Sequence, residues 1–201
     1  VILGSQNLVA VLGIVTAVGS MISMALCPLL IKKLNERNAY ILLSVYGFAA
    51  SIFSFVIGHF WFQSPKNMVL TVLFYASLFL IGLQFGAVTL MPMIMTADAV
   101  DYYEYETGKR MEGACYSILT LTIKVCLALG TAVGLIFVQK SGYYESLTAG
   151  TFTTKTKDII FFAYTALPGI LALISIFPMF KYDIVGEKKA KISYELAARR
   201  K

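Results

Sequence analysis

Five long apolar runs, separated by short polar segments, divide the chain. The runs cover residues 8–31, 40–60, 69–96, 114–139 and 158–180. A helix of about 20 apolar residues crosses the hydrocarbon core of a bilayer, and each run reaches that length. The runs are too long for the strands of a membrane barrel, and a helix satisfies its own backbone in lipid. The pattern predicts an all-α fold, a polytopic membrane bundle of five spans over residues 1–180.

Composition agrees with a membrane protein. The chain is 58% hydrophobic and only 14% charged, whereas soluble domains carry roughly 25% charged residues. Its net charge of +6 does not indicate nucleic-acid binding, because most of that charge lies next to the ends of spans. The three cysteines, Cys27, Cys115 and Cys126, lie within or beside apolar runs. We interpret them as small core residues rather than as a disulfide set or metal ligands.

Lysine and arginine distribute unequally between the two sides of the predicted bundle. Twelve lie in segments 32–39, 97–113 and 181–201, and four lie on the other side, at Lys66, Lys140, Lys155 and Lys157. The positive-inside rule places the larger set in the cytoplasm, beneath a plasma (inner) membrane. Residues 181–201 then form a cytoplasmic basic tail, a weakly amphipathic helix near anionic lipid. Because the chain starts at Val1 without an initiator Met or a basic leader, we expect it to be the end of a longer chain.

Small residues follow one face of the second run, spaced three and four apart: Ser44, Gly47, Ser51, Ser54 and Gly58. Faces of this kind usually let helices pack closely, and we favour packing over pore lining. The third run contains one full amide, Gln84. Two interpretations of Gln84 stay open, an interhelical hydrogen bond or the lining of a cavity in the pathway.

Lys124 is an isolated cation inside the fourth run. Small or hydroxyl-bearing residues lie within about 40° of it on a helical wheel, namely Gly113, Ser117, Thr120, Ala128 and Thr131. A lysine that faces lipid at mid-span costs roughly 2.5–3.5 kcal/mol on insertion scales, and an aqueous cavity removes most of that cost. We therefore favour a place in a transport pathway, shared with Ser117 and Thr120. The alternative is a structural lysine that pairs with a carboxylate from outside the apolar cores.

A charged block separates the third and fourth runs. Its candidate functional residues are Asp98, Asp101, Tyr102, Glu104, Gly108, Arg110 and Glu112. Asp98 and Asp101 are three positions apart and share one helical face, while Gly108 can supply a turn. We interpret the block as an ion-pair latch between helix ends that biases two conformations. A divalent-metal site is the disfavoured alternative, because hard-metal loops usually alternate Asp or Asn and include a Gly.

The charged block also forms a specific sequence motif. It reads Ala97-Asp98-Ala99-Val100-Asp101-Tyr102-x-Glu104-Tyr105-x-Thr107-Gly108-x-Arg110-x-Glu112-Gly113-x-x-Tyr116-Ser117, followed by Lys124. This motif resembles the glycoside–pentoside–hexuronide:cation symporter family, the melibiose-carrier-like branch of the major facilitator superfamily. The segment Pro28-Leu29-Leu30-x-Lys32-Lys33-Leu34 is similar to the loop between helices eight and nine of that family. The resemblance covers essentially the whole chain, as helices 8–12 of a twelve-helix fold.

The resemblance implies a secondary active transporter that imports a sugar, a glycoside or a sugar acid by symport with Na⁺ or H⁺ through alternating access. It implies that Lys124 faces the central cavity near the sugar and cation sites, and that Thr120 occupies a cavity position. The main cation-binding carboxylates would belong to N-terminal helices of the same carrier, which become implied partners beside the lipid bilayer. No cofactor is expected besides the coupling cation, and no nucleic acid.

Two other functions compete with transport. A truncated remnant or scaffold would not transport at all. A membrane enzyme would use Asp98, Asp101 and Glu104 as catalytic groups, but the sequence offers no nucleophile–base pair, metal-ligand cluster or phosphate-binding loop to complete them. We therefore predict that the chain is not an enzyme.

Overall fold

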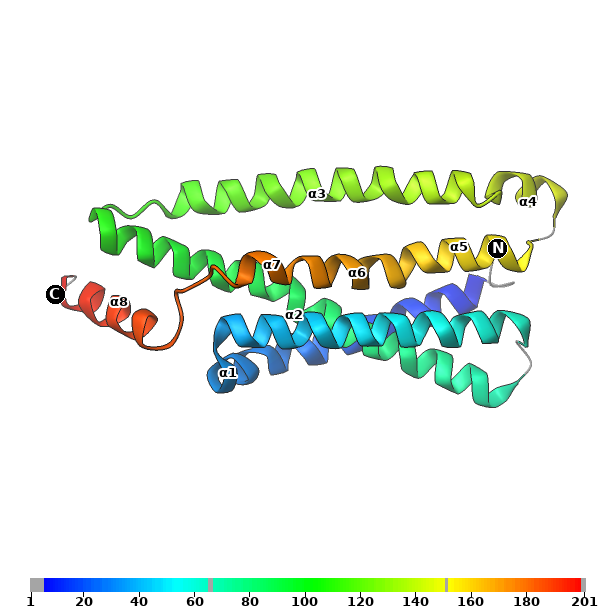
Figure 1. Ribbon diagram of the computed structural model, residues 1–201, viewed down its shortest axis with the longest axis horizontal. Coiled ribbons are helices and arrows are strands. Elements are labelled where there is room, and N and C mark those ends of the chain that lie inside the picture. Colours follow the sequence, from blue (N-terminus) through cyan, green and yellow to red (C-terminus); the bar gives the residue numbers. More distant parts are fainter. Residues whose placement is uncertain (1–5, 65–66, 151, 200–201) are drawn as a thin grey trace.

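The computed structural model describes residues 6–64, 67–150 and 152–199. Val1, Lys66, Arg200 and Lys201, which entered the predictions above, lie outside these residues. The described residues form helices and no strand: α1 (Gln6–Gln63), α2 (Met68–Thr107), α3 (Glu112–Lys140), α4 (Tyr143–Ala149), α5 (Thr154–Tyr164), α6 (Ala166–Ile174), α7 (Ile176–Met179) and α8 (Gly186–Arg199). In Figure 1, α3 runs along one side of the molecule, α1 lies on the other, and α5–α7 run between them, while α2 crosses from beside α1 to the start of α3.

Four helical stretches of the described chain are long and apolar enough to cross a membrane: Val11–Gln63, Met68–Thr107, Glu112–Lys140 and Thr154–Met179. The first stretch contains two of the predicted spans, because Asn35 breaks the helical geometry with φ 63° and ψ 161°. Figure 1 shows the chain reversing there, so that the two halves of α1 run antiparallel. The all-α membrane bundle is confirmed, and the bounds of the individual spans stay predictions.

The buried apolar core lies between α1 and α2. One cluster contains Cys27, Ala39, Ala87 and Met91, and a second contains Trp61, Phe74, Leu78 and Ile81. The interpretation of the cysteines as core residues holds for Cys27, which is 2% exposed. It is wrong for Cys126, which is exposed, and Cys115 is only half-buried. Both lie on α3, which no other described helix covers deeply enough to bury.

Glycines bring the first half of α1 into backbone contact with α2. A Cβ added to Gly86 would lie 2.1 Å from the carbonyl oxygen of Ser20, and one added to Gly82 would lie 2.4 Å from that of Thr16. Two small residues four positions apart form the small-xxx-small pattern that allows membrane helices to approach closely. The contact leaves no room for a side chain at either glycine.

The small-residue face of the second half of α1 is buried, as the packing interpretation predicts. Its three serines, Ser44, Ser51 and Ser54, are at most 1% exposed. Ser54 accepts a hydrogen bond from Ser77 of α2 at 3.0 Å. A Cβ on Gly58 would meet the ring of Phe161 in α5 at 2.1 Å, so α5 packs on the same face. The prediction of close helix packing is confirmed for this face.

Candidate transport site and its charged end

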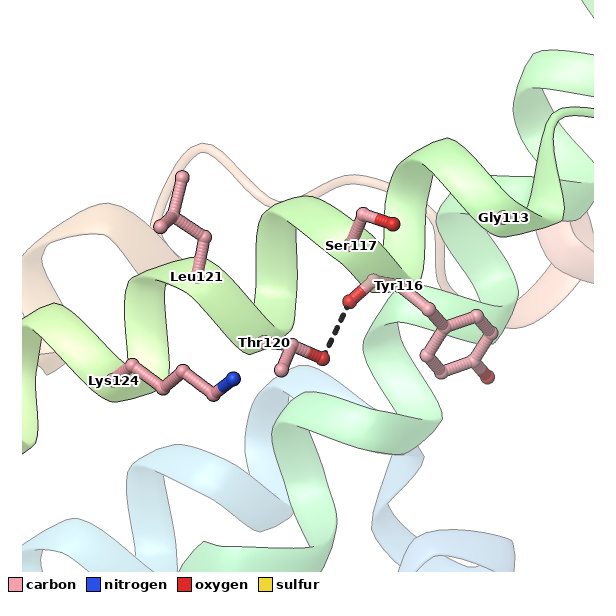
Figure 2. A pocket seen from close by; sticks show the side chains of 6 residues that line it. All are labelled: Gly113, Tyr116, Ser117, Thr120, Leu121 and Lys124. Atoms are coloured by element: carbon pink, nitrogen blue, oxygen red, sulfur yellow. Dashed lines mark hydrogen bonds between the residues drawn. The ribbon is translucent and has the colours of Figure 1, made fainter.

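The predicted pathway residues of α3 line an open pocket of about 400 Å³. Its lining consists of Gly113, Tyr116, Ser117, Thr120, Leu121 and Lys124. Figure 2 shows the amine of Lys124 and the hydroxyl of Thr120 on the same side of α3, whereas Leu121 points away from that side. No residue of α3, which the structure describes throughout, is buried. The polar stripe predicted from the sequence therefore faces open space in this chain.

Lys124 and Thr120 offer this pocket different hydrogen-bonding groups. The hydroxyl of Thr120 donates to the carbonyl oxygen of Tyr116 at 2.8 Å, which leaves its oxygen lone pairs as acceptors. The ammonium group of Lys124 can donate three hydrogen bonds. Among residues 6–64, 67–150 and 152–199, no ion pair joins Lys124 to a carboxylate. The structural-lysine alternative has no partner within that part of the chain, and the amine stays available to a hydroxyl-rich or anionic ligand.

Gln84 lies apart from this pocket. Gln84 is 7% exposed and packs between α1 and α2. A Cβ added to Gly47 of α1 would lie 2.0 Å from the Gln84 Cδ. The pocket lining does not include it. Of the two interpretations left open for Gln84, its position favours the interhelical one, and the structure does not bring it together with Lys124.

The charged block contains the end of α2 and the start of α3. Gly108 adopts the left-handed conformation, with φ 69°, and its N–H donates to the carbonyl oxygen of Glu104 at 2.9 Å. A glycine tolerates this conformation because it has no Cβ. The turn directs the chain from α2 to α3 and brings Arg110 back toward the side chains of α2.

Arg110 connects three carboxylates at this turn. Its Nη1 lies 2.9 Å from Glu104 and 3.3 Å from Asp101, and its Nε lies 3.2 Å from Glu112. Hydrogen bonds to Glu104 and Glu112 raise the pKa of the Arg110 guanidinium. The arginine therefore ties the end of α2 to the first residue of α3, which is the arrangement expected of an ion-pair latch.

Asp98 takes a different set of partners. The Lys189 amine lies 2.7 Å from its Oδ1, and the hydroxyl of Tyr182 donates to its Oδ2 at 3.2 Å. The same amine lies 2.5 Å from Glu36, next to the Asn35 turn in α1. Asp98 and Asp101 have different ion-pair partners, because Lys189 of the tail binds Asp98 and Arg110 binds Asp101. Both aspartates nevertheless line one small pocket with Lys189 and Ile192 of α8, as their spacing on one helical face predicts. Sequence reasoning missed Glu36, Tyr182 and Lys189, since only the tertiary fold brings them together.

The tail helix α8 packs on α2 along one face. Ile192 and Leu196 are 4% and 3% exposed. The Lys188 amine lies 4.9 Å from the centre of the Tyr102 ring, and the Arg199 guanidinium lies 5.3 Å from that of Tyr105. The tail forms the helix that the sequence predicts, and protein covers its apolar face.

Replacing Arg110 by glutamine is expected to loosen the turn between α2 and α3 without unfolding the bundle. The affected ion pairs are largely exposed, and pairs of that kind contribute little to global stability. Hydrogen exchange at residues 108–112 should speed up in R110Q and stay unchanged in K109Q, which alters an exposed neighbour. Equal exchange in the two variants would contradict the latch.

Comparisons with known proteins agree with this geometry. The family model described as "MFS/sugar transport protein" matches residues 1–186. A protein named "Glucuronide carrier protein homolog" from Escherichia coli is 24% identical over all of the chain and 41% of its own length. A "Putative sulfoquinovose importer" from the same organism is 24% identical over all of the chain and 40% of its own length. A "Lactose permease" from Lactobacillus delbrueckii is 27% identical over 97% of the chain and 30% of its own length.

The chain thus spans less than half the length of these three relatives. No solved structure matches it at a significant level. The family match covers almost the whole chain and includes the pocket of α3 and the charged block. The helices, the motif and the relatives all confirm the resemblance to sugar–cation symporters, and the chain belongs to the MFS/sugar transport protein family.

Proposed function

We propose that this chain is the C-terminal part of a secondary active transporter that imports a sugar, a glycoside or a sugar acid together with Na⁺ or H⁺ by alternating access. The observation that carries the proposal is the open pocket of α3, where Lys124 and Thr120 present a cation and a hydroxyl to the same space. An ionisable residue within a membrane span, such as Lys124, indicates a functional site by default. Ser117, which lines the same pocket, is a further pathway residue.

The N-terminal helices of the same carrier are the proposed cover of this pocket. The relatives are at least twice as long as the part that this chain matches. No residue of α3 is fully buried in this chain, and its polar stripe is unsuited to lipid. Helices that cover the stripe would enclose the pocket and contribute the remaining ligands of the sugar and the cation, while the apolar side of α3 faces the bilayer.

The C-terminus is proposed to lie in the cytoplasm. The three basic segments, 32–39, 97–113 and the tail, meet at one end of the bundle, where Lys189 contacts both Glu36 and Asp98. A shared end is what the positive-inside rule requires of them. The ion pairs of Arg110 at this end would then act as a latch on the cytoplasmic side during alternating access.

Two alternatives make different predictions. A non-transporting remnant or scaffold would give no flux, and an enzyme would turn over a substrate in detergent without any gradient. The test is uptake of radiolabelled glycosides, pentosides and hexuronides into membrane vesicles that contain the complete carrier, with and without Na⁺ or proton gradients. We expect one class of sugar to enter in response to a cation gradient. Failure of every sugar to enter vesicles that contain folded carrier would favour the remnant.

A further inference from the structure

The tail helix α8 contacts two segments that are far apart in sequence, the turn of α1 and the end of α2. Its Lys189 lies between Glu36, beside the turn of α1, and Asp98, near the end of α2. Both carboxylates are buried, at 5% and 8% exposure, so one lysine serves two acidic groups away from solvent. On the same face of α8, the apolar side chains of Ile192 and Leu196 pack inward.

Charge makes this docking depend on Lys189. Burial lowers the pKa of Lys189, but hydrogen bonds to Asp98 and Glu36 outweigh it, so the pKa is raised and the amine stays ionised. Burial and the neighbouring Asp98 raise the pKa of the Tyr182 hydroxyl, which therefore keeps its proton and donates a hydrogen bond to Asp98. Removing one partner of a buried pair leaves an uncompensated charge, and here two buried carboxylates would lose the partly exposed lysine that they share.

Two basic residues bind carboxylates at the end of α2. Lys189 of α8 binds Asp98, and Arg110 binds Asp101 and Glu104. Tyr102 and Tyr105 also contact α8. Arg110 connects α2 to α3, and Lys189 connects α2 to the turn of α1. These two links act on different pairs of helices, so they can be disrupted separately.

We propose that Lys189 is a positioning residue, which docks α8 as a strap across the turn of α1 and the end of α2 and makes these two helix ends move together. The docking itself is independent of the proposed function, and only its consequence for the transport rate rests on that function. Lys189 does not line the pocket on α3, so its role is distinct from binding the sugar.

Thiol labelling of the complete carrier in membranes tests the docking. Leu196→Cys, in a background without the native cysteines, places a thiol under the strap, and Tyr194→Cys places one on the 78% exposed side. In inside-out vesicles, which expose the proposed cytoplasmic side, a membrane-impermeant maleimide should modify position 194 rapidly and position 196 slowly. Adding Lys189→Met should speed the labelling of position 196 by about tenfold or more, because it leaves two buried carboxylates without the lysine that they share. Lys191→Met makes the same change on the exposed face of α8 and should leave that rate unchanged.

Two further variants keep the test decisive. Lys189→Arg preserves the charge and should retain the protection of position 196. If Lys189→Met lowers the yield of folded carrier, combining it with Glu36→Gln and Asp98→Asn should restore the yield, since no buried charge remains, while α8 stays undocked. Protection of position 196 that survives Lys189→Met would overturn the proposal, because the apolar contacts alone would then hold α8.

Uptake measurements distinguish a failure of the docking proposal from a failure of the proposed transport function. In a carrier that transports sugar, Lys189→Met should lower the maximal uptake rate and leave the half-saturating sugar concentration unchanged. A change in that concentration alone would contradict a positioning role. A carrier in which labelling responds as expected but which transports no sugar would refute the proposed function and leave the docking by Lys189 intact.

Discussion

Replacing Gly86 by valine is expected to prevent the assembly of α1 with α2. A Cβ at position 86 would lie 2.1 Å from the Ser20 oxygen, 2.8 Å from its carbonyl carbon and 2.9 Å from its Cα. These are backbone atoms, which cannot rotate away as a side chain can. Overpacking costs about 1–3 kcal/mol and occasionally more, and a contact with backbone falls at the upper end of that range. The yield of monodisperse carrier in detergent, together with its thermal denaturation, measures the effect.

Gly130 provides the matched control for this prediction. It lies inside α3, where a Cβ would meet nothing within 4 Å. Replacing glycine by valine changes the intrinsic helix propensity equally at positions 130 and 86, so the difference between the two variants isolates the packing contact. We predict a large loss of folded yield and thermal stability for G86V and little or none for G130V. Equal losses would mean that α1 and α2 do not approach as closely as the structure has them.

Replacing Lys124 by alanine is expected to reduce gradient-driven sugar uptake by about tenfold to a hundredfold while the carrier stays folded. A hydrogen bond to a charged group contributes roughly 1.5–3 kcal/mol, which corresponds to that range of affinity or rate. The fold should tolerate the change, because Lys124 lies on a helix with no buried residue and forms no ion pair within the described part of the chain. Initial rates of uptake, normalised to the amount of folded carrier, provide the measurement.

Lys140 serves as the control for Lys124. It is the last residue of the same helix and does not line the pocket. K140A should transport as well as the unaltered carrier, and K124R, which keeps the cation, should retain more activity than K124A. Unchanged uptake in K124A would remove Lys124 from the pathway and return it to the structural alternative.

Much of the fold was predictable from the local periodicity of the sequence. Apolar runs predicted the helices, and the spacing of Ser44, Ser51 and Ser54 predicted a packed face because all three lie on one helix. The wheel around Lys124 placed Ser117 and Thr120 beside it for the same reason, and all three line the pocket. Features that depend on a single helix were therefore predictable from the order of residues alone.

Contacts between distant segments were not predictable in this way. Lys189 and Glu36 are 153 positions apart, and nothing in a tail with several lysines distinguishes the one that reaches two buried carboxylates. The different partners of Asp98 and Asp101 depend on where α8 docks and where the turn at Gly108 directs Arg110. The position of Gln84 was open because its environment depends on the approach of α1, through Gly47.

Uphill accumulation of sugar tests the central claim most directly. The purified complete carrier is reconstituted into liposomes, a Na⁺ or proton gradient is imposed, and the internal concentration of a transported sugar is followed over time. We predict that the sugar rises above its external concentration and that the excess disappears when an ionophore collapses the gradient of the coupling cation. Sugar that only equilibrates, at the same rate with every gradient present or absent, would contradict symport.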